Sequence, residues 1–496
     1  MSDLSGIFKA YDIRGLVPEE LDARKARAIG WAFARLCISE ASRNSGSSVI
    51  PQSSRNYDSP ESLVAPDGTV SAGNHNAPDA IVVCRDMRES GRELVKEFAE
   101  GAMAAGMSIK DAGMTSTDMA YFISGDLNLP AAIFTASHNP AAYNGIKLCY
   151  SGARPVGQET GLAKLMQMAT DVLDTGDYLA GPAPGTDSDS IDMLQNYVEH
   201  VLSFIDISTL RSMVVVADTA NGMGGLVVPE VFSRLPFEYH ILYPELDGNF
   251  PNHPADPIQE KNLSDLKRAV LDKGADVGLA FDGDADRVFL VDENARPVSG
   301  SLTTALVASS MLTKFPGATI LYNIICSKVV PETISSMGGK PIRTRVGHSF
   351  IKQVMAETGA LFGGEHSGHY YFRDNYRADS GMIAALMVLE LMSRSGKPLS
   401  ELVKPLQRYN ASGEINTVVD DPAHVVAGVA DRLVKQGVYC DMTDGLTVDY
   451  GSWWFNLRPS NTEPLLRLNV EASHEIDLDA CIHEVEDLID EVNDAR

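Results

Sequence analysis

Short runs of apolar and β-branched residues alternate with longer amphipathic stretches along most of the chain. Runs typical of buried strands occur at residues 80–84, 131–135, 212–217, 276–281, 288–291 and 319–323. Helical periodicity covers residues 21–36, 89–105 and 380–393. Strands that alternate with helices in this way predict α/β units with mixed or mostly parallel sheets.

The last part of the chain, from about residue 411, has a different pattern. It contains three expected strands followed by one closing helix, at residues 414–419, 454–457, 465–471 and 477–492. This order predicts a small α+β domain. Residues 42–78 are rich in Ser, Asn, Pro and Gly and contain few apolar side chains, so we expect a flexible surface insertion there.

A chain of 496 residues is too long for one hydrophobic core. We expect four domains. Domain I (residues 1–175) is an α/β domain that includes the insertion, and domains II (residues 176–296) and III (residues 297–409) are further α/β domains. Domain IV (residues 410–496) is the C-terminal domain. No apolar stretch is long enough to span a membrane and the N-terminus lacks a signal pattern, so we expect a cytoplasmic protein. The net charge of −26 argues against nucleic acid as a partner.

The first candidate for chemistry is Ser137, in the segment TASHNP at residues 135–140. The segment follows an expected strand, and its Asn and Pro are compatible with an ordinary turn. The alternative is that the strand end presents the Ser137 hydroxyl on a rigid loop. The chain has no GxSxG segment, which argues against an esterase triad. A serine that carries and returns a phosphoryl group would need a divalent cation nearby.

Three carboxylates supply a candidate cation site. Asp282, Asp284 and Asp286 alternate along the loop DGDADR, directly after the expected strand at 276–281. Oxygen ligands at this spacing can converge on one hard cation and leave positions free for a phosphate oxygen, as Mg²⁺ prefers. An EF-hand is excluded because Arg287 occupies the position that requires Gly. A solvated acidic turn is the alternative.

Two further loops have the composition of binding sites. The segment RPSNTEPLLR, residues 458–467, follows an expected strand and suits a phosphate-binding nest, although it is not a P-loop and an ordinary turn is the alternative. The Gly-rich segment GGEHSGH, residues 363–369, offers Glu, Ser and His side chains to sugar hydroxyls. A zinc pair of His366 and His369 is disfavoured, because the glycines argue against a helix and no third ligand is evident.

Basic residues occur at two smaller features. Lys9 and Arg14 flank the expected strand-to-turn segment KAYDIRG, and Lys147 follows Asn144-Gly145, which we interpret as a turn signal. Each alone is more often surface charge than a functional group.

Taken together, these residues resemble the α-D-phosphohexomutase superfamily, most closely its phosphomannomutase/phosphoglucomutase branch. The segments KAYDIRG, TASHNP, DGDADR, GEHSGHYYF and RPSNTEP occur in the family's order across almost the whole chain. The resemblance implies four domains around a central cleft, namely three related α/β domains and a smaller C-terminal α+β domain that closes over the substrate. It also implies an intramolecular phosphotransferase of the isomerase class.

The resemblance implies a role for each motif residue. Ser137 is expected to be the phosphoserine and to bind Mg²⁺ together with Asp282, Asp284 and Asp286. The expected catalytic residues are Ser137, Arg14, Lys147, Arg287 and His369. The general base is left open among His369, His348 and Lys147. The expected substrate-binding residues are Lys9, His348, Glu365, Ser367, Arg458, Ser460, Asn461, Thr462 and Arg467.

The expected reaction converts mannose 6-phosphate to mannose 1-phosphate, with phosphoglucomutase activity as well. Phosphoryl transfer through a hexose 1,6-bisphosphate makes that bisphosphate the expected activator. Alternatives are a phosphoglucosamine mutase and, in another class, a non-catalytic phosphosugar-binding protein. Two segments depart from the family's pattern, the 42–78 insertion and residues 85–91. We expect neither to touch the motifs that define the chemistry.

Overall fold

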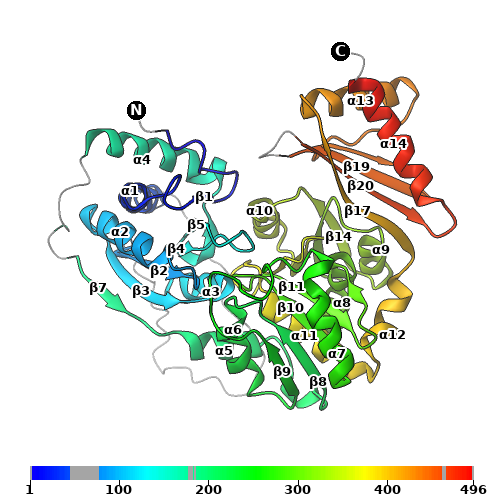
Figure 1. Ribbon diagram of the computed structural model, residues 1–496, viewed down its shortest axis with the longest axis horizontal. Helices are drawn as coiled ribbons and strands as arrows, with labels where there is room; N and C mark the ends of the chain where they lie inside the picture. Colours follow the sequence, from blue (N-terminus) through cyan, green and yellow to red (C-terminus); the bar gives the residue numbers. More distant parts are fainter. Residues whose placement is uncertain (1–2, 45–77, 177–182, 184–185, 461–464, 494–496) are drawn as a thin grey trace, which may run out of the picture.

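The computed structural model describes residues 3–44, 78–176, 183, 186–460 and 465–493 (Figure 1). Within these residues, four β-sheets follow one another along the chain. We use domains I to IV for the parts that contain the first to the fourth sheet. The insertion predicted at residues 42–78 lies almost wholly outside the described residues. Within the described ranges, no helix is both long and apolar enough to cross a membrane.

Domain I contains a mixed sheet in the order β1-β5-β4-β2-β3-β7, with β6 paired to β5. The strands are β1 (Ile13–Leu16), β2 (Ala80–Arg85), β3 (Ser108–Met114), β4 (Ala131–Phe134), β5 (Tyr143–Tyr150), β6 (Arg154–Pro155) and β7 (Ser188–Ser190). Strand β5 runs antiparallel to both β1 and β4, whereas β4, β2, β3 and β7 are parallel to one another.

Alternate side chains of β2 enter two different hydrophobic cores. Ile81 and Val83 pack with α1 (Ala23–Asn44), α2 (Gly91–Ala104) and α4 (Ala163–Thr175) on one face. Val82 and Cys84 pack with α3 (Thr117–Leu127) on the other. A strand buried on both faces is expected to be a continuous apolar run, as AIVVC is.

Domain II contains the sheet β12-β11-β10-β8-β9. Its strands are β8 (Val214–Asp218), β9 (Glu238–Leu242), β10 (Val277–Phe281), β11 (Val288–Asp292) and β12 (Pro297–Val298), and its helices are α5 (Leu194–Leu202), α6 (Gly224–Phe232) and α7 (Ser264–Lys273). Strands β8, β9 and β10 are parallel, and β11 is antiparallel to β10.

Domain III contains the sheet β14-β13-β15-β16, in which only β16 is antiparallel to its neighbour. Its strands are β13 (Thr319–Asn323), β14 (Lys340–Thr344), β15 (Phe362–Gly364) and β16 (Tyr370–Phe372), and its helices are α8 (Gly300–Lys314), α9 (Val329–Ser336), α10 (His348–Thr358), α11 (Gly381–Ser395) and α12 (Leu399–Val403).

Domain IV is an antiparallel sheet in the order β17-β20-β19-β18 with two helices. Its elements are β17 (Tyr409–Val418), α13 (Pro422–Lys435), β18 (Leu446–Asp449), β19 (Trp453–Pro459), β20 (Leu465–Ser473) and α14 (Leu478–Asn493). Figure 1 shows this orange and red domain standing apart from domain I, with α10 between them.

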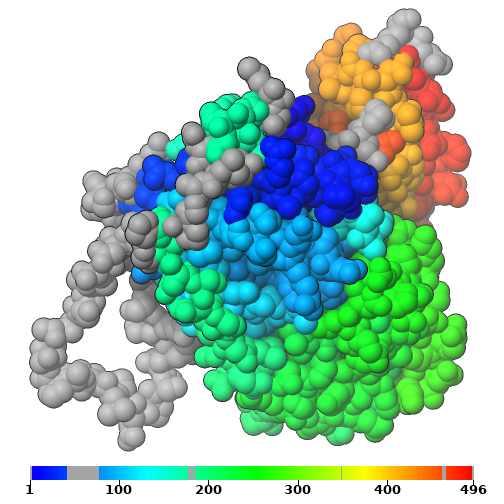
Figure 2. Space-filling view, turned by 60° about the vertical axis from the view of Figure 1, so that its left-hand side comes forward, coloured from blue at the N-terminus to red at the C-terminus, as the bar shows by residue number. Residues whose placement is uncertain are grey.

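The cores divide the molecule into a large block and a smaller unit. One continuous core contains side chains of α3, α6, α8 and α11, so it joins domains I, II and III. Domain IV has a core of its own between its sheet and its two helices. Figure 2 shows the same division from the side, with the blue and cyan domain I resting against the green domains and the orange domain IV beside them.

The interpretation of Asn144-Gly145 as a turn is wrong. Both residues lie within β5, where Asn144 pairs with Gly15 and Gly145 with Arg14 of β1. A Cβ on Gly145 would lie 2.5 Å from the carbonyl oxygen of Ile13 and 2.7 Å from that of Thr135. The glycine therefore permits close packing of three strands rather than a reversal of the chain.

Candidate active site

Three predicted loops occupy the same place in three sheets. In each of domains I, II and III a loop joins the last strand of the parallel part to an antiparallel strand. The Ser137 loop joins β4 to β5, the aspartate loop joins β10 to β11, and the Glu365–His369 loop joins β15 to β16. Equivalent connections thus carry the three candidate functions.

Ser137 lies three residues beyond the end of β4 in a strained backbone conformation. Its φ is +50°, in the left-handed region that non-glycine residues seldom adopt. The Thr135 hydroxyl accepts a hydrogen bond from the Ser137 N–H at 2.9 Å. The Ser137 hydroxyl donates to an oxygen of Asp282 at 2.7 Å. This conformation therefore aims the serine hydroxyl at the aspartate loop.

The backbones of the two loops almost touch. A Cβ on Gly283 would lie 2.4 Å from the carbonyl oxygen of Ser137, so any larger residue would push the loops apart. The same glycine also accepts a backbone hydrogen bond, because the Met223 N–H donates to the Gly283 carbonyl at 2.8 Å. The Gly in DGDADR is thus required by close approach to the serine.

The three aspartates form a buried cluster. Asp282, Asp284 and Asp286 each offer a carboxylate oxygen within 4.8 Å of the others. The Oδ1 atoms of Asp284 and Asp286 are buried, and neither has a hydrogen-bond partner in the described part of the chain. Such orphaned carboxylate oxygens suit a hard divalent cation. The donor set therefore fits the predicted metal site.

Cationic side chains surround this cluster. The ammonium group of Lys147 lies 2.8 Å from Asp284 and 2.7 Å from Asp286. The guanidinium of Arg287 donates to Asp282 at 2.8 Å. These contacts bring together β5 of domain I and the aspartate loop of domain II.

The pKa values of the cluster reflect this crowding. Burial raises the pKa of Asp282 well above its usual range, although Arg287 opposes that shift. Burial and the charge of Asp284 also raise the pKa of Asp286. Burial acts in the same direction on Asp284, but Lys147 and Thr117 bring its pKa below the ordinary value.

Lys147 itself stays protonated in this arrangement. Burial acts to lower its pKa, but the charges of Asp284 and Asp286 outweigh that effect and raise the pKa well above the ordinary value. A protonated lysine supplies positive charge beside Ser137 and cannot accept a proton. Of the predicted bases, Lys147 is therefore disfavoured while the two aspartates hold it.

Arg14 reaches the serine loop from the first strand. Its guanidinium donates to the side-chain oxygen of Asn139 at 2.7 Å and to Asp12 at 2.5 Å. Arg14 thus lies beside the TASHNP segment, as the sequence predicts. Lys9 lies apart from this segment. Its ammonium donates to the Gly6 carbonyl at 2.6 Å, and its side chain lines a separate cavity.

The predicted sugar loop is held firmly at Glu365. Its carboxylate accepts hydrogen bonds from the Tyr371 hydroxyl at 2.7 Å and from the Asn323 amide at 3.2 Å. His369 lies nearer the metal cluster, with its Nε2 3.9 Å from Asp286 and its Nδ1 3.0 Å from the Ser367 hydroxyl. An antiparallel bridge between Arg287 and His369 joins this loop to the aspartate loop.

The remaining predicted residues belong to domain IV and to α10. Glu414 of β17 forms ion pairs with two of them, Arg458 at 2.9 Å and Arg467 at 3.4 Å. The Ser460 N–H donates to the Leu465 carbonyl at 2.8 Å. Asn461 and Thr462 lie outside the described residues. His348 is the first residue of α10, and its side chain is likewise outside the described part.

Arg88 is a site residue that the sequence interpretation missed. We expected residues 85–91 not to touch the chemical motifs, and that expectation is wrong. The buried guanidinium of Arg88 donates to four backbone carbonyls of the serine loop and its exit, those of Ser137, Asn139, Pro140 and Tyr143, at 2.7–2.9 Å. The signal was available, because Arg88 follows β2, which lies parallel to β4 and ends at the same edge.

Thr117 and His138 were also missed. The Thr117 hydroxyl, at the start of α3, donates to Asp284 at 2.6 Å. Burial together with Arg287 and Arg14 lowers the pKa of His138 to about 2, so its ring is neutral. Its Nδ1 lies 2.6 Å from a guanidinium nitrogen of Arg287 and therefore accepts that hydrogen bond.

Family models match the chain in four consecutive parts. They describe phosphoglucomutase/phosphomannomutase alpha/beta/alpha domain I at residues 67–172, domain II at 195–296, domain III at 299–409 and the C-terminal domain at 414–488. The predicted fold class, three α/β domains and a C-terminal domain, is confirmed.

Relatives of known name match over nearly the whole chain. A protein named phosphohexose mutases from Xanthomonas campestris pv. campestris is 38% identical over 94% of each chain. A phosphomannomutase from Escherichia coli K12 is 35% identical over 95% of this chain and 96% of that protein. A phosphomannomutase from Methanocaldococcus jannaschii is 33% identical over 97% of each chain.

A solved structure agrees with these sequence matches. A phosphoglucomutase/phosphomannomutase family protein from Burkholderia thailandensis superimposes with a TM-score of 0.81 and 29% identity, covering 99% of this chain and 98% of that one. The predicted family and the predicted enzyme class, a mutase among the isomerases, are confirmed. The chain belongs to the phosphoglucomutase/phosphomannomutase family.

Proposed function

We propose that this protein is a phosphomannomutase that converts mannose 6-phosphate to mannose 1-phosphate and also acts on glucose phosphates. Relatives at 33–35% identity over nearly their full length carry the name phosphomannomutase. The observation that carries the reaction is the hydrogen bond from Ser137 to Asp282 at 2.7 Å, within a cluster of carboxylates and cations.

Ser137 is the proposed phosphoryl carrier. The free hydroxyl of a hexose monophosphate attacks the phosphorus of phosphorylated Ser137, and the bond between that phosphorus and the serine oxygen breaks. The product is a hexose 1,6-bisphosphate, which turns over in the cleft. Its other phosphate then returns to the Ser137 oxygen, which gives the isomeric monophosphate. Hexose 1,6-bisphosphate therefore phosphorylates free enzyme and serves as the activator.

Asp282, Asp284 and Asp286 are proposed to hold Mg²⁺, with an oxygen of the phosphoserine as a further ligand. When bound, the ion neutralises negative charge on the transferring phosphoryl group. Lys147, Arg287 and Arg14 supply further positive charge, which the spread charge of a loose transition state requires. Their ion pairs and hydrogen bonds with Asp284, Asp282 and Asn139 fix them beside Ser137 in advance.

His369 is the base that we favour. It is part-exposed, it lies 3.9 Å from Asp286, and the Ser367 hydroxyl lies beside its Nδ1. A neutral imidazole there can take the proton of the attacking hydroxyl. Glu365 and Ser367 are proposed to hold sugar hydroxyls. Arg458, Ser460, Asn461 and Thr462 are proposed to contact the phosphate that does not react, with Arg467 and His348 as further substrate-binding residues. Lys9 was also predicted to bind substrate, but it lines a separate cavity and is left out of this proposal. Cytoplasmic location and the lack of a nucleic-acid partner stay predictions.

The test is Ser137→Ala, with Ser203→Ala on the exposed end of α5 as a matched control. Intact-mass and peptide analysis should find one phosphoryl group on Ser137 in the wild type and in the control, and none in Ser137→Ala. Mutase activity should fall by at least a thousandfold only in Ser137→Ala. Near-normal turnover in that variant would exclude the phosphoserine mechanism.

Substrate preference needs a separate comparison. Steady-state rates on mannose, glucose and glucosamine phosphates distinguish the proposed activity from a glucosamine phosphate mutase. We expect the largest kcat/KM with mannose 1-phosphate and a comparable value with glucose 1-phosphate. A larger kcat/KM for glucosamine phosphate would overturn the proposed substrate but not the mutase reaction.

A further inference from the structure

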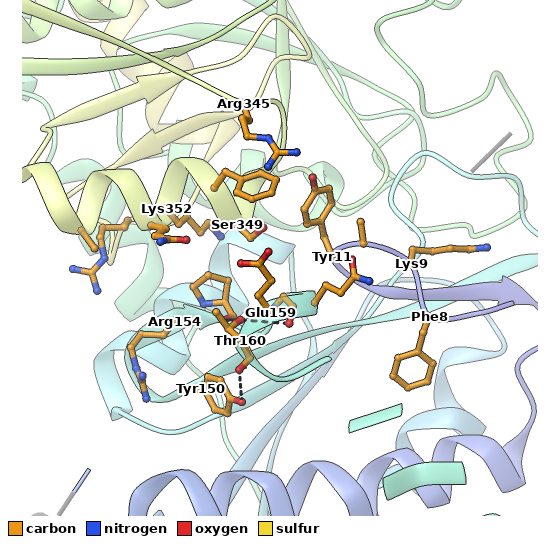
Figure 3. A pocket seen from close by; sticks show the side chains of 18 of the residues that line it. Phe8, Lys9, Tyr11, Tyr150, Arg154, Glu159, Thr160, Arg345, Ser349 and Lys352 are labelled. Carbon is orange, nitrogen blue, oxygen red and sulfur yellow. Dashed lines mark hydrogen bonds between the residues drawn. The ribbon is translucent and has the colours of Figure 1, made fainter. Parts of the chain in front are cut away.

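A cavity of about 1060 Å³ lies between domain I and α10 of domain III (Figure 3). Its walls come from residues 5–11, from residues 150–160 at the end of β5 and beyond, and from one side of α10 with Arg345 before it. Ser137 and the three aspartates are not among the lining residues. The cavity is therefore separate from the cluster around the serine.

The cavity carries an excess of positive charge. Four of its cations, Lys9, Arg154, Arg345 and Arg377, have no carboxylate within ion-pair distance anywhere in the described ranges. A fifth, Lys352, is paired with Asp379 at 3.1 Å. Among the described residues, only two carboxylates line the cavity, those of Glu40 and Glu159. In a chain with a net charge of −26, so many unpaired cations at one place indicate an anionic ligand.

Two of these guanidinium groups come from different domains and face the same space. Arg154 begins β6 in domain I, where its Nε donates to the Ser151 carbonyl at 3.3 Å and its guanidinium lies over the Tyr150 ring. Arg377 precedes α11 in domain III. Burial and the charge of Arg154 lower the pKa of Arg377, which places the two like charges within electrostatic reach. An anion between them would relieve this repulsion.

Neutral polar groups complete the lining. Gln158, Thr160, Ser349 and Gln353 offer hydrogen bonds, and the N-terminal turn of α10 contributes Ser349. The Arg345 guanidinium lies 4.5 Å from the centre of the Phe350 ring, which holds it at the cavity wall. Figure 3 shows Arg345 and Arg154 on opposite sides of Glu159, with Lys352 at the helix α10. The volume suits a ligand of several carbon atoms rather than a bare ion.

We propose that this cavity binds a small phosphate monoester whose body carries hydroxyl groups. Its phosphate dianion matches the excess of two positive charges, and its hydroxyls match the amide and hydroxyl side chains. A ligand held by Arg154 and Arg377 bridges domains I and III. The proposal does not depend on the mutase reaction, because Arg154, Arg345 and Arg377 form no ion pair with the aspartate cluster in the described ranges.

The binding test uses glycerol 3-phosphate as the probe, in equilibrium dialysis at low ionic strength. The double variant Arg154→Gln/Arg377→Gln should bind one equivalent fewer than the wild type, or bind that equivalent at least tenfold more weakly. Glu159→Gln removes a negative charge from the cavity and should lower the Kd of the same equivalent about threefold. Arg268→Gln, on the exposed face of α7, is the matched control and should bind as the wild type does.

Two outcomes would overturn the proposal. One is equal stoichiometry and equal Kd for wild type and the double variant. The other is an inorganic phosphate affinity as high as that of glycerol 3-phosphate, which would exclude the ester. Mutase activity without added glycerol 3-phosphate should stay within twofold of wild type in the double variant, which establishes that it is folded. Loss of turnover in Ser137→Ala tests the proposed function independently.

Discussion

At the scale of single residues, buried side chains outside the predicted motifs hold the Ser137 loop and the aspartate loop in place. The Arg88 guanidinium donates hydrogen bonds to carbonyls of the serine loop, and the Thr117 hydroxyl donates to one oxygen of Asp284. Both residues are buried. Groups that hold metal ligands in place commonly affect affinity by 10–100-fold, although they never touch the ion.

We expect Thr117→Val to weaken Mg²⁺ binding about tenfold, close to 1.4 kcal/mol. Valine keeps the shape of the side chain but cannot donate to Asp284, whose oxygen would lose a charge-assisted hydrogen bond of 2.6 Å. Activity titrated with Mg²⁺ measures the apparent Kd, and kcat at saturating Mg²⁺ should change less than threefold. The control is Thr115→Val, because the Thr115 hydroxyl contacts none of the three aspartates. An unchanged Mg²⁺ midpoint in Thr117→Val would refute this role.

The residue scale also shows where sequence patterns suffice. Ser137, Asp282 and Asp286 could be found because each lies in a polar loop directly after an apolar strand. Thr117 could not be found in this way, since its contact with Asp284 joins two domains. His138 lies in the same loop as Ser137, but the local pattern does not show its contact with Arg287 of domain II. Thr117 is 167 residues from Asp284 in the chain, and no local pattern records that distance. Residues that are close in space but distant in the sequence can be identified only once the fold is known.

At the scale of elements, strongly periodic segments were predictable and short connected strands were not. Strand β13 matches the predicted residues 319–323, and α11 begins one residue after the predicted start at 380. Strand β5 was missed because Asn144-Gly145 resembles a turn. Its pairing with β1 and β4 supplies backbone hydrogen bonds on both edges, and this tertiary context outweighs the local preference.

The crossing of α1 and α2 offers a test of packing at this scale. A Cβ on Gly101 of α2 would lie 1.9 Å from the Arg27 carbonyl of α1, and a Cβ on Gly30 of α1 would lie 2.1 Å from the Phe98 carbonyl of α2. Reciprocal glycines thus let the two backbones touch.

We expect Gly101→Ala to lower the free energy of unfolding by about 1–3 kcal/mol, because the helices must separate. The sign is informative, since alanine in an ordinary helix interior would raise stability by about 1 kcal/mol. Urea denaturation measures the change. Gly6→Ala, where a Cβ meets nothing within 4 Å, is the control and should lie within about 0.5 kcal/mol of wild type. A stabilised Gly101→Ala would mean that the helices do not cross so closely.

At the scale of the whole molecule, domains I, II and III are joined by a polar node as well as by a shared core. Asp118 at the start of α3 accepts hydrogen bonds from Ser116, from Tyr197 of α5 and from Ser380 before α11. The three hydroxyls therefore come from three different parts of the chain. Burial raises the pKa of Asp118 to about 6, although these hydrogen bonds oppose the shift.

This raised pKa predicts a pH-dependent stability. Between the unfolded pKa near 3.8 and the folded pKa of about 6, the native state binds more protons than the unfolded state. The Asp118 contribution to the free energy of unfolding should therefore fall as pH rises through this window, by about 3 kcal/mol in all. Asp118→Asn cannot titrate, so its stability relative to wild type should increase from pH 4 to pH 7. A difference that is constant with pH would contradict the assignment.

Domain IV is joined to this block differently. Its core is separate, and its first strand, β17, carries Glu414, which pairs with Arg458 at 2.9 Å. A unit with its own core can move against the block without breaking either core. If the RPSNTEP segment binds the phosphate that does not react, substrate binding recruits domain IV to the cleft.

Arg458→Ala should then raise KM strongly, by about 2–3 kcal/mol if a charged, bidentate contact is lost. The effect on kcat should be smaller, because only part of the remote binding energy is expressed in the transition state. More hexose 1,6-bisphosphate should escape, since one end of the intermediate is no longer held while it turns over. Steady-state kinetics with a trap for released bisphosphate measure all three quantities. Arg432→Ala removes an arginine of α13 that pairs with Glu491, also in domain IV, and should change none of them. If Arg458→Ala leaves KM and bisphosphate release at wild-type values, the segment is an ordinary turn and domain IV does not bind the phosphate through it.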